Sequence, residues 1–170
     1  MAEQAQVKQR GPAPKVVPGR LVVGIDPDLV KSGIALVRDG QLVELCALGF
    51  PHLLEYARQL VDGNALFVVE DVEHDSTTYH RARTNNRAHA RIAQNVGQVK
   101  GVARVLVECL QHMGADVQQI KPLSGPTKRR AKTDAAYFNQ ITGWPGRSNA
   151  DTRDAALLAL YGLKTGSNSQ

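Results

Sequence analysis

Apolar residues are arranged along this chain in two patterns. The first, a short and mostly apolar run, predicts strands. No polar residue interrupts the run LVVGI at residues 21–25, which is typical of a strand covered on both faces. Two more extended runs follow, and the Asp39-Gly40 pair between them is a strong hairpin signal. We therefore expect three consecutive strands, at residues 21–25, 32–38 and 41–49.

The second pattern, with apolar residues three and four positions apart, predicts helices. It is present at residues 51–61, and a short apolar run at 65–69 then predicts a fourth strand. A helix between two strands implies a crossover, so this strand should lie parallel to the first. Beyond it we expect a helix at 85–113, a strand at 115–120, a loop at 121–132, a helix that Thr133 begins and Gly143 closes, and a last helix at 150–163.

Length and composition predict one domain with two short extensions. The 170 residues suit a single hydrophobic core, which we place at residues 21–163. Residues 1–20 combine glycine and proline with basic residues and have little to bury, so we expect a flexible basic arm there. Residues 164–170 should fray.

Charge and cysteine content narrow the class of protein. The formal net charge of +5 favours an acidic partner, with nucleic acid the leading candidate. No apolar run approaches the roughly 18 residues that cross a bilayer, so we expect no membrane partner. Cys46 and Cys109 lie in separate predicted elements without a secretory segment before them, which predicts a reduced, cytoplasmic protein.

Acidic residues end two of the predicted strands and open the last helix. Asp26 and Glu70 should both lie at the carboxyl edge of the sheet, where open α/β sheets build their sites. Asp151 and Asp154 are three apart and therefore share one helix face. Taken singly, these residues have structural interpretations: an Asx-turn for Asp26 and helix-dipole complementarity for the helical pair.

Taken together, the four acids predict a metal site. Carboxylates at one point repel each other unless cations lie between them, and carboxylate oxygens without cysteine or histidine suit Mg²⁺ or Mn²⁺. Two such ions about 4 Å apart would activate water and stabilise the leaving oxygen of a phosphodiester.

Five segments of the chain resemble, in order, those of the RuvC-type Holliday junction resolvases of the RNase H-like nuclease superfamily. They are GIDPDLVKSGIALV, LFVVEDVE, NVGQVKGVARVL, SGPTKRRAKTDA and DTRDAALLALYG. The resemblance implies an α/β, RNase H-like fold, with a five-stranded mixed sheet whose first three strands are antiparallel, flanked by helices. It also implies a metal-dependent, structure-selective endonuclease that resolves four-way (Holliday) DNA junctions by paired symmetric nicks in DNA recombination and repair.

The resemblance further implies the site and the partners. Asp26, Glu70, Asp151 and Asp154 correspond to the catalytic, metal-binding acids, which hold two Mg²⁺ ions or Mn²⁺ in their place. The family acts as a homodimer on branched DNA, and no organic cofactor is expected. The cytoplasm of a bacterial cell or of a phage-infected host is the expected location.

Two glycines bear on the dimer. Gly97 and Gly101 are four apart in the predicted long helix, where glycine needs a structural reason. They would let two copies pack closely, as at the dimer interface of the family. The competing interpretation is packing on the sheet.

A one-sided basic stretch in the second half of the chain suits a phosphate track, although a charge run is otherwise a solvated face. Lys132 falls where the family has a lysine that contacts the DNA backbone. Tyr79 is either the aromatic that stacks on bases at the branch point or a surface tyrosine. The residues predicted to bind DNA are Tyr79, Arg81, Arg83, Arg87, Lys128, Arg129, Arg130 and Lys132.

The chain departs from the family pattern at two places. Asp28 stands where the family usually has glycine, and the segment 74–95 is longer and more basic than the family's loop. The alternatives are therefore an RNase H-like nuclease that acts on flaps, forks or RNA–DNA hybrids, and a junction-binding module that has lost catalysis. An actin-like ATPase, which shares the Gly-Ile-Asp strand, is disfavoured because the chain is too short and lacks a second glycine-rich phosphate loop.

Overall fold

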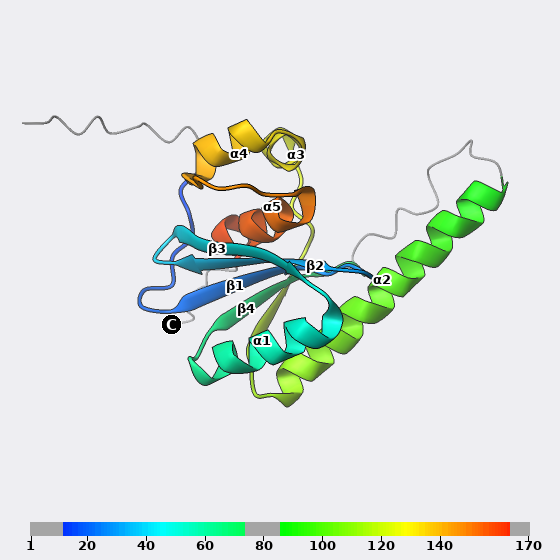
Figure 1. The fold of residues 1–170 in the computed structure, drawn as a ribbon, viewed down its shortest axis with the longest axis horizontal. Coiled ribbons are helices and arrows are strands. Elements are labelled where there is room, and N and C mark those ends of the chain that lie inside the picture. Colours follow the sequence, from blue (N-terminus) through cyan, green and yellow to red (C-terminus); the bar gives the residue numbers. More distant parts are fainter. Residues whose placement is uncertain (1–11, 74–85, 164–170) are drawn as a thin grey trace, which may run out of the picture.

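The computed structural model describes residues 12–73 and 86–163 and contains one five-stranded mixed sheet with helices on both faces (Figure 1). The strands are β1 (Leu21–Asp26), β2 (Ser32–Arg38), β3 (Gln41–Leu48), β4 (Leu66–Glu70) and β5 (Asp116–Ile120). The helices are α1 (Phe50–Asp62), α2 (Asn86–His112), α3 (Pro126–Thr133), α4 (Ala135–Thr142) and α5 (Ala150–Leu157), which continues into a π-helical turn (Leu158–Gly162).

Strand pairing confirms the predicted fold class. The strand order is β3-β2-β1-β4-β5, in which β1, β2 and β3 are antiparallel neighbours, β4 is parallel to β1, and β5 is parallel to β4. The β2–β3 connection is the predicted tight turn, because Asp39 and Gly40 both have positive φ, 50° and 78°. The chain therefore has an RNase H-like α/β fold.

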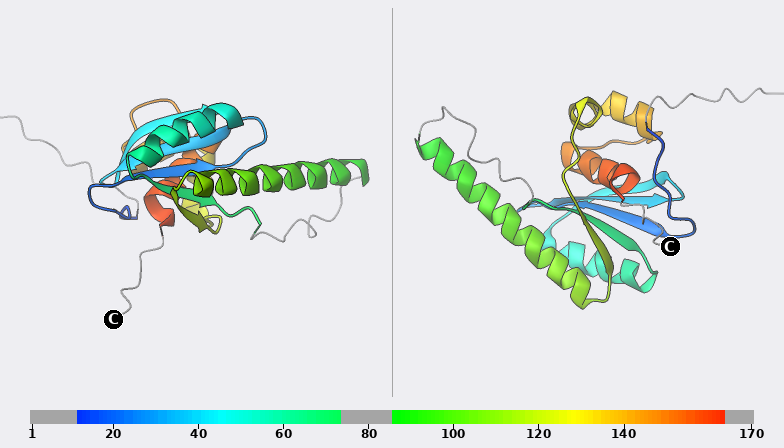
Figure 2. Two further views of the ribbon diagram at one scale, coloured as in Figure 1. Left: turned by 90° about the horizontal axis from the view of Figure 1, so that it is seen from below. Right: turned by 180° about the vertical axis from the view of Figure 1, so that it is seen from behind.

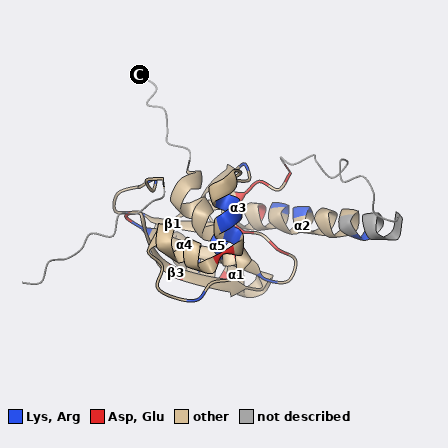
Figure 3. Cartoon of the chain, turned by 90° about the horizontal axis from the view of Figure 1, so that it is seen from above, with Lys and Arg blue, Asp and Glu red and all other residues tan. Residues whose placement is uncertain are grey.

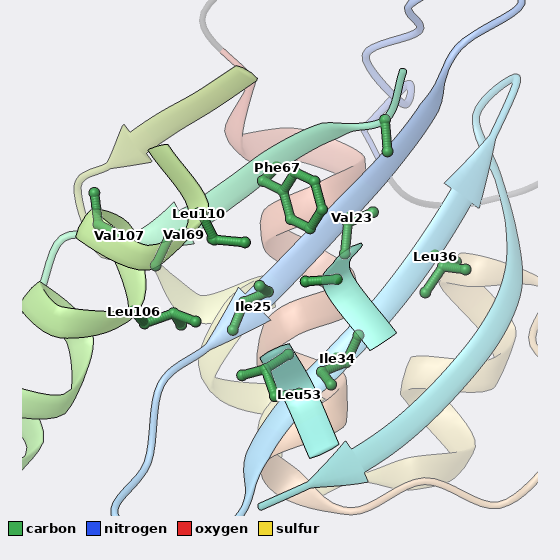
Figure 4. Packing of buried hydrophobic residues seen from close by; sticks show 12 residues of the cluster. Val23, Ile25, Ile34, Leu36, Leu53, Phe67, Val69, Leu106, Val107 and Leu110 are labelled. Atoms are coloured by element: carbon green, nitrogen blue, oxygen red, sulfur yellow. The ribbon is translucent and has the colours of Figure 1, made fainter. Parts of the chain in front are cut away.

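Two groups of helices cover the two faces of the sheet. On one face, Ile25 and Phe67 of the sheet pack with Leu53 of α1 and Leu106 of α2 (Figure 4). On the other face lie α3, α4 and α5 (Figure 2). No helix of the described residues, the 27-residue α2 included, is both long and apolar enough to cross a membrane.

The first half of α2 extends away from the sheet (Figure 1). A Cβ atom added at Gly97 or Gly101 would meet nothing within 4 Å in the described part of the chain. The interpretation that these glycines serve packing on the sheet is therefore wrong, because the sheet does not reach them.

The predicted loop at 121–132 is wrong, since α3 occupies most of it. Of the eight residues of α3, all described, only Ala131 is buried, so the helix has no apolar periodicity to reveal it. Pro126 at its first turn suits a helix start. The next helix begins two residues later than predicted, at Ala135, because Asp134 caps α4 by accepting a hydrogen bond from the Tyr137 N–H at 2.9 Å.

Part of the predicted N-terminal arm contacts the domain. The Lys15 N–H donates to the Leu160 carbonyl at 2.7 Å, and its ammonium donates to the Leu163 carbonyl at 2.6 Å. Residues 1–11, where the arm was expected to be flexible, and residues 164–170, the expected tail, lie outside the described residues. Their flexibility and the domain boundaries stay predictions.

Candidate functional site

Asp26 and Glu70 lie on neighbouring strands at the carboxyl edge of the sheet. β1 and β4 are parallel, with Ile25 opposite Val69, so the next step of the register brings Asp26 opposite Glu70. Successive side chains on a strand point to opposite faces. Because Ile25 and Val69 pack in the core beneath α1 and α2, both carboxylates face the α5 side.

Two glycines allow α5 to rest directly on the strands. A Cβ at Gly24 would lie 2.1 Å from a carbonyl oxygen of α5, and one at Gly33 would lie 2.3 Å from the Asp151 carbonyl oxygen. The helix start is set by a capping box, in which the Asn149 side chain accepts from the Thr152 N–H at 2.8 Å and the Thr152 hydroxyl accepts from the Asn149 N–H at 3.0 Å. The close packing of α5 and its fixed first turn therefore place Asp151 and Asp154 near the edge of the sheet.

Asp154 is buried between two lysines of α3. Its side chain is 3% exposed, and its Oδ2 lies 2.5 Å from the Lys132 ammonium and 3.3 Å from the Lys128 ammonium. Its Oδ1 is buried and has no hydrogen-bond partner among the residues described. An unpaired buried acceptor is unfavourable, so this oxygen is suited to a ligand that the protein itself does not supply.

The pKa of Asp26 shows that the charges of three acids interact. Burial raises this pKa from 3.8 to about 8, with further contributions from the charge and hydrogen bond of Glu70 and from the charge of Asp154, while the Lys132 ammonium opposes the rise. Burial by itself lowers the pKa of Lys132, but the hydrogen bond and charge of Asp154, with the charges of Asp26 and Glu70, raise it above its usual range. Asp26, Glu70 and Asp154 are therefore close enough to perturb one another, and the Lys132 ammonium offsets only part of the rise in the pKa of Asp26.

The remaining acids near the site have other surroundings. Asp151 lies one turn before Asp154 and is half-buried, and among the described residues it is not one of those that set the pKa of Asp26. The Asp28 carboxylate accepts from the Val30 N–H at 2.9 Å. This hydrogen bond closes an Asx-turn in the β1–β2 loop and gives Asp28 a structural role.

α3 presents basic residues on two sides. Lys128 and Lys132, four apart, reach inward to Asp154, whereas Arg129 and Arg130 are exposed, and Arg130 lies 3.6 Å from the Asp134 carboxylate. Figure 3 shows basic residues of α3 close to acidic residues of the chain. The four residues predicted together as DNA-binding are thus of two kinds: one pair contacts a site acid and the other faces solvent.

The other residues predicted to bind DNA come from the segment before and at the start of α2. Tyr79, Arg81 and Arg83 lie outside the described residues, and Arg87 lies in the first turn of α2, where only the backbone is described. Their roles stay predictions.

A small cavity of about 170 Å³ adjoins Glu70. α2 lines it with Lys100 and Arg104, and the segment after β4 lines it with Asp71 and Glu73. Arg104 pairs with Glu73, and the Asp71 side chain accepts from the Glu73 N–H at 3.1 Å. Of the three acids at the end of β4, Glu70 is therefore the one engaged with Asp26.

The donor set fits a hard divalent cation. Interacting carboxylates, an unpartnered Asp154 oxygen and the raised pKa of Asp26 are what Mg²⁺ or Mn²⁺ would relieve. As arranged, however, no three His, Cys, Asp or Glu side chains in the described ranges are grouped closely enough to form a metal cage. In this arrangement the ammonium groups of Lys128 and Lys132 contact Asp154 Oδ2.

One residue of the site was not assigned from the sequence. Arg153, between Asp151 and Asp154, is only 8% exposed and donates to the carbonyls of Lys132 and Ser148. The available signal was a lone arginine in the mostly small and apolar segment DTRDAALLAL, because a buried guanidinium requires several acceptors.

Comparison with known proteins yields a distant likeness in structure. No model of a known family matches the chain, and no curated protein does. Among solved structures, the chain is similar to Thermus thermophilus RuvC, both alone and in complex with a Holliday junction substrate. In each case the identity is 16%, the match covers 82% of this chain and 90% of that chain, and the TM-score is 0.49. A likeness at this distance assigns no function, so the proposals below rest on the residues of the site.

Proposed function

We propose that this protein is a metal-dependent endonuclease that cuts branched DNA, with the four-way junction as its substrate and paired symmetric nicks as its product. The observation that supports this proposal most strongly is the group of interacting carboxylates of Asp26, Glu70 and Asp154 at the carboxyl edge of the sheet. Buried carboxylates that perturb one another are typical of catalytic sites, since a purely structural role would favour pairing each acid with a base. The resemblance of the five sequence segments to RuvC-type resolvases supports the choice of substrate.

In this proposal the acids hold two Mg²⁺ ions, or Mn²⁺ in their place. Asp26 would contribute to both ions, Glu70 and Asp154 would each contribute to one, and Asp151 would complete the set. Bound there, the ions would activate the attacking water and stabilise the leaving oxygen of the phosphodiester, which leaves 5′-phosphate and 3′-hydroxyl ends.

The chain's own residues bind and orient the DNA. Arg129 and Arg130 are exposed on α3, the helix whose lysines contact Asp154, and would contact phosphates without reading sequence. Lys100 and Arg104 of α2 are placed at the cavity beside Glu70, where a strand that approaches the acids would pass. Together these residues would guide a polyanion toward a negatively charged centre.

The active form in this proposal is a homodimer, because symmetric nicking requires two equivalent sites. The exposed side of α2 supports this arrangement: no described residue would meet a Cβ at Gly97 or Gly101, and Val105 on the same helix is 47% exposed. A second copy of the chain would cover these small residues with its own backbone.

The test compares two aspartates of the same loop region. Asp26→Asn should abolish cleavage of a synthetic four-way junction in Mg²⁺, at least 1,000-fold by order of magnitude, and leave junction binding in Ca²⁺ unchanged. Asp28→Asn is the matched control, since asparagine keeps the oxygen that accepts from the Val30 N–H. This control should cut at close to the wild-type rate.

The outcomes separate the alternatives. Cleavage by Asp26→Asn would show that the acids do not act as proposed. Binding without cleavage by the wild-type protein, in Mn²⁺ as well as Mg²⁺, would identify a junction-binding module. A panel of four-way junctions, flaps, forks and RNA–DNA hybrids then ranks the substrates, and preference for any but the four-way junction would contradict the proposed specificity.

A further inference from the structure

Arg153 joins the last helix to the end of α3. Its Nε and Nη2 donate to the Lys132 carbonyl at 3.0 and 2.6 Å, and its Nη1 donates to the Ser148 carbonyl at 2.9 Å and hydroxyl at 3.2 Å. Among the ion pairs between described residues, none includes Arg153. This buried cation is satisfied by carbonyl and hydroxyl oxygens and is not used to neutralise an acid.

The Lys132 carbonyl is an acceptor at the end of a helix. Carbonyls in the last turn lack partners within the helix, and a cation near a helix C-terminus interacts favourably with the helix dipole. α3 ends at Thr133, so the guanidinium of Arg153 gives the Lys132 carbonyl a hydrogen-bond donor and also places a cation near the C-terminus of the helix. Ala131, next to Lys132, is fully buried, which leaves the backbone at this point little freedom.

The same residue thus connects two parts of the site. Arg153 precedes Asp154 in α5, and the lysine whose carbonyl it binds sends its ammonium to Asp154 Oδ2 at 2.5 Å. The backbone of Lys132 is held through Arg153, while its side chain reaches the carboxylate one residue further along α5. The result is a closed loop of contacts through Lys132, Arg153 and Asp154.

We propose that Arg153 is a positioning residue, which holds the Lys132 ammonium against Asp154 by fixing the Lys132 carbonyl. This inference rests on the proposed function, because the acid concerned belongs to the proposed cleavage site. A lysine with four rotatable bonds reaches one oxygen of a buried carboxylate only if its backbone is fixed. Displacement of a site group by about 1 Å is enough to lower a rate by about 100-fold.

The first measurement is a double-mutant cycle in single-turnover cleavage of a labelled four-way junction, with saturating full-length protein in Mg²⁺. Arg153→Met should lower the rate at least tenfold and leave the dissociation constant in Ca²⁺ within twofold, while Arg153→Lys, which can still donate to the carbonyl, should recover part of the rate. Lys132→Met keeps the carbonyl and removes the ammonium. In that background Arg153→Met should change the rate by less than twofold.

Additive effects of Arg153→Met and Lys132→Met would overturn the proposal, since a residue that only holds the helices together would act whether or not the ammonium is present. Equal loss in the Arg153→Met and Arg153→Lys variants would overturn it as well. Thermal unfolding of each variant identifies any that fail to fold. If Arg153→Met fails to fold, the cycle is completed with Arg153→Lys in its place.

The second measurement does not depend on activity. The ammonium of Lys132 should give a slowly exchanging ¹H–¹⁵N signal in metal-free protein, assigned by its absence in Lys132→Met. This signal should disappear in Arg153→Met and persist in Arg153→Lys. Its persistence in folded Arg153→Met would contradict the positioning role, even if the protein proves to cut no junction; cleavage failure of the wild type would contradict only the proposed function.

Discussion

The contact between α5 and the sheet and the first half of α2 each contain a pair of glycines, and the two pairs have opposite surroundings. At Gly24 and Gly33 an added Cβ would enter the backbone of α5, whereas at Gly97 and Gly101 it would meet open space within the described chain. The first pair is required by the monomer. The second pair has no such role in the part of the chain that the structure describes.

The two regions also differ in how they hold charge. Asp154, at the α5 contact, is buried against two lysines, whereas Arg104 and Glu73, beside the cavity on α2, form an ion pair whose side chains are 64% and 51% exposed. An exposed pair contributes about 0–1 kcal/mol, because water competes for both groups. A buried acid with one oxygen unpaired is more sensitive to its surroundings. Close packing therefore makes Asp154, on the α5 side, the more sensitive of the two charged positions.

The strongest challenge to this comparison is Gly24→Ala. Its Cβ would lie 2.1 Å from a backbone oxygen of α5, which cannot swing aside like a side chain, so we expect a loss of about 3 kcal/mol in the free energy of unfolding. Urea denaturation measures it. Gly63→Ala, at a position with ordinary contact distances, is the matched control and should change stability by less than about 1 kcal/mol. A loss of less than about 1 kcal/mol in the Gly24→Ala variant would show that α5 does not pack as closely as described.

The pH dependence of the free energy of unfolding tests the difference between the buried acids near α5 and the exposed ion pair beside α2. The pKa of Asp26 is raised to about 8, so between pH 3.8 and 8 the folded protein holds a proton that the unfolded chain has released. The stability that Asp26 contributes is therefore fully present below about pH 3.8 and is lost as the pH rises to about 8, with a slope of at most about 1.4 kcal/mol per pH unit. We expect the free energy of unfolding of the metal-free protein to fall by about 2 kcal/mol between pH 5 and 7.

Asp26→Asn should remove most of this slope, while Glu73→Gln, in the exposed pair, should leave it unchanged. Urea unfolding in EDTA at several pH values provides the measurement. A slope that survives in Asp26→Asn would place the titrating group elsewhere in the molecule.

The smallest expected effect concerns α2. Gly101→Ala should raise the free energy of unfolding by about 0.5–1 kcal/mol in dilute, monomeric protein, because alanine favours the helix and no described atom obstructs it. If a second copy covers this face, the same change should weaken the dimer, which sedimentation over a concentration series detects. Destabilisation of the monomer would show instead that the chain itself covers Gly101.

Much of the fold follows from short-range patterns. The Asp39-Gly40 turn, the parallel β4 and the acids at the ends of β1 and β4 were predictable, because strand alternation and crossover geometry depend on neighbours in sequence. α3 was not predictable in this way. Its single buried residue, Ala131, leaves no periodicity, and its Lys132 carbonyl is held by Arg153, 21 residues further along the chain.

The sequence by itself determined the five strands and every helix except α3, which carboxylates end the parallel strands, and that Asp151 and Asp154 share a helix. Only the tertiary structure decided that Lys128 and Lys132 contact Asp154 while Arg129 and Arg130 face solvent, and that one arginine ties two helices together. The physical reason is range: periodicity and turn chemistry act over a few residues, whereas burial and ion pairing depend on which distant surfaces meet.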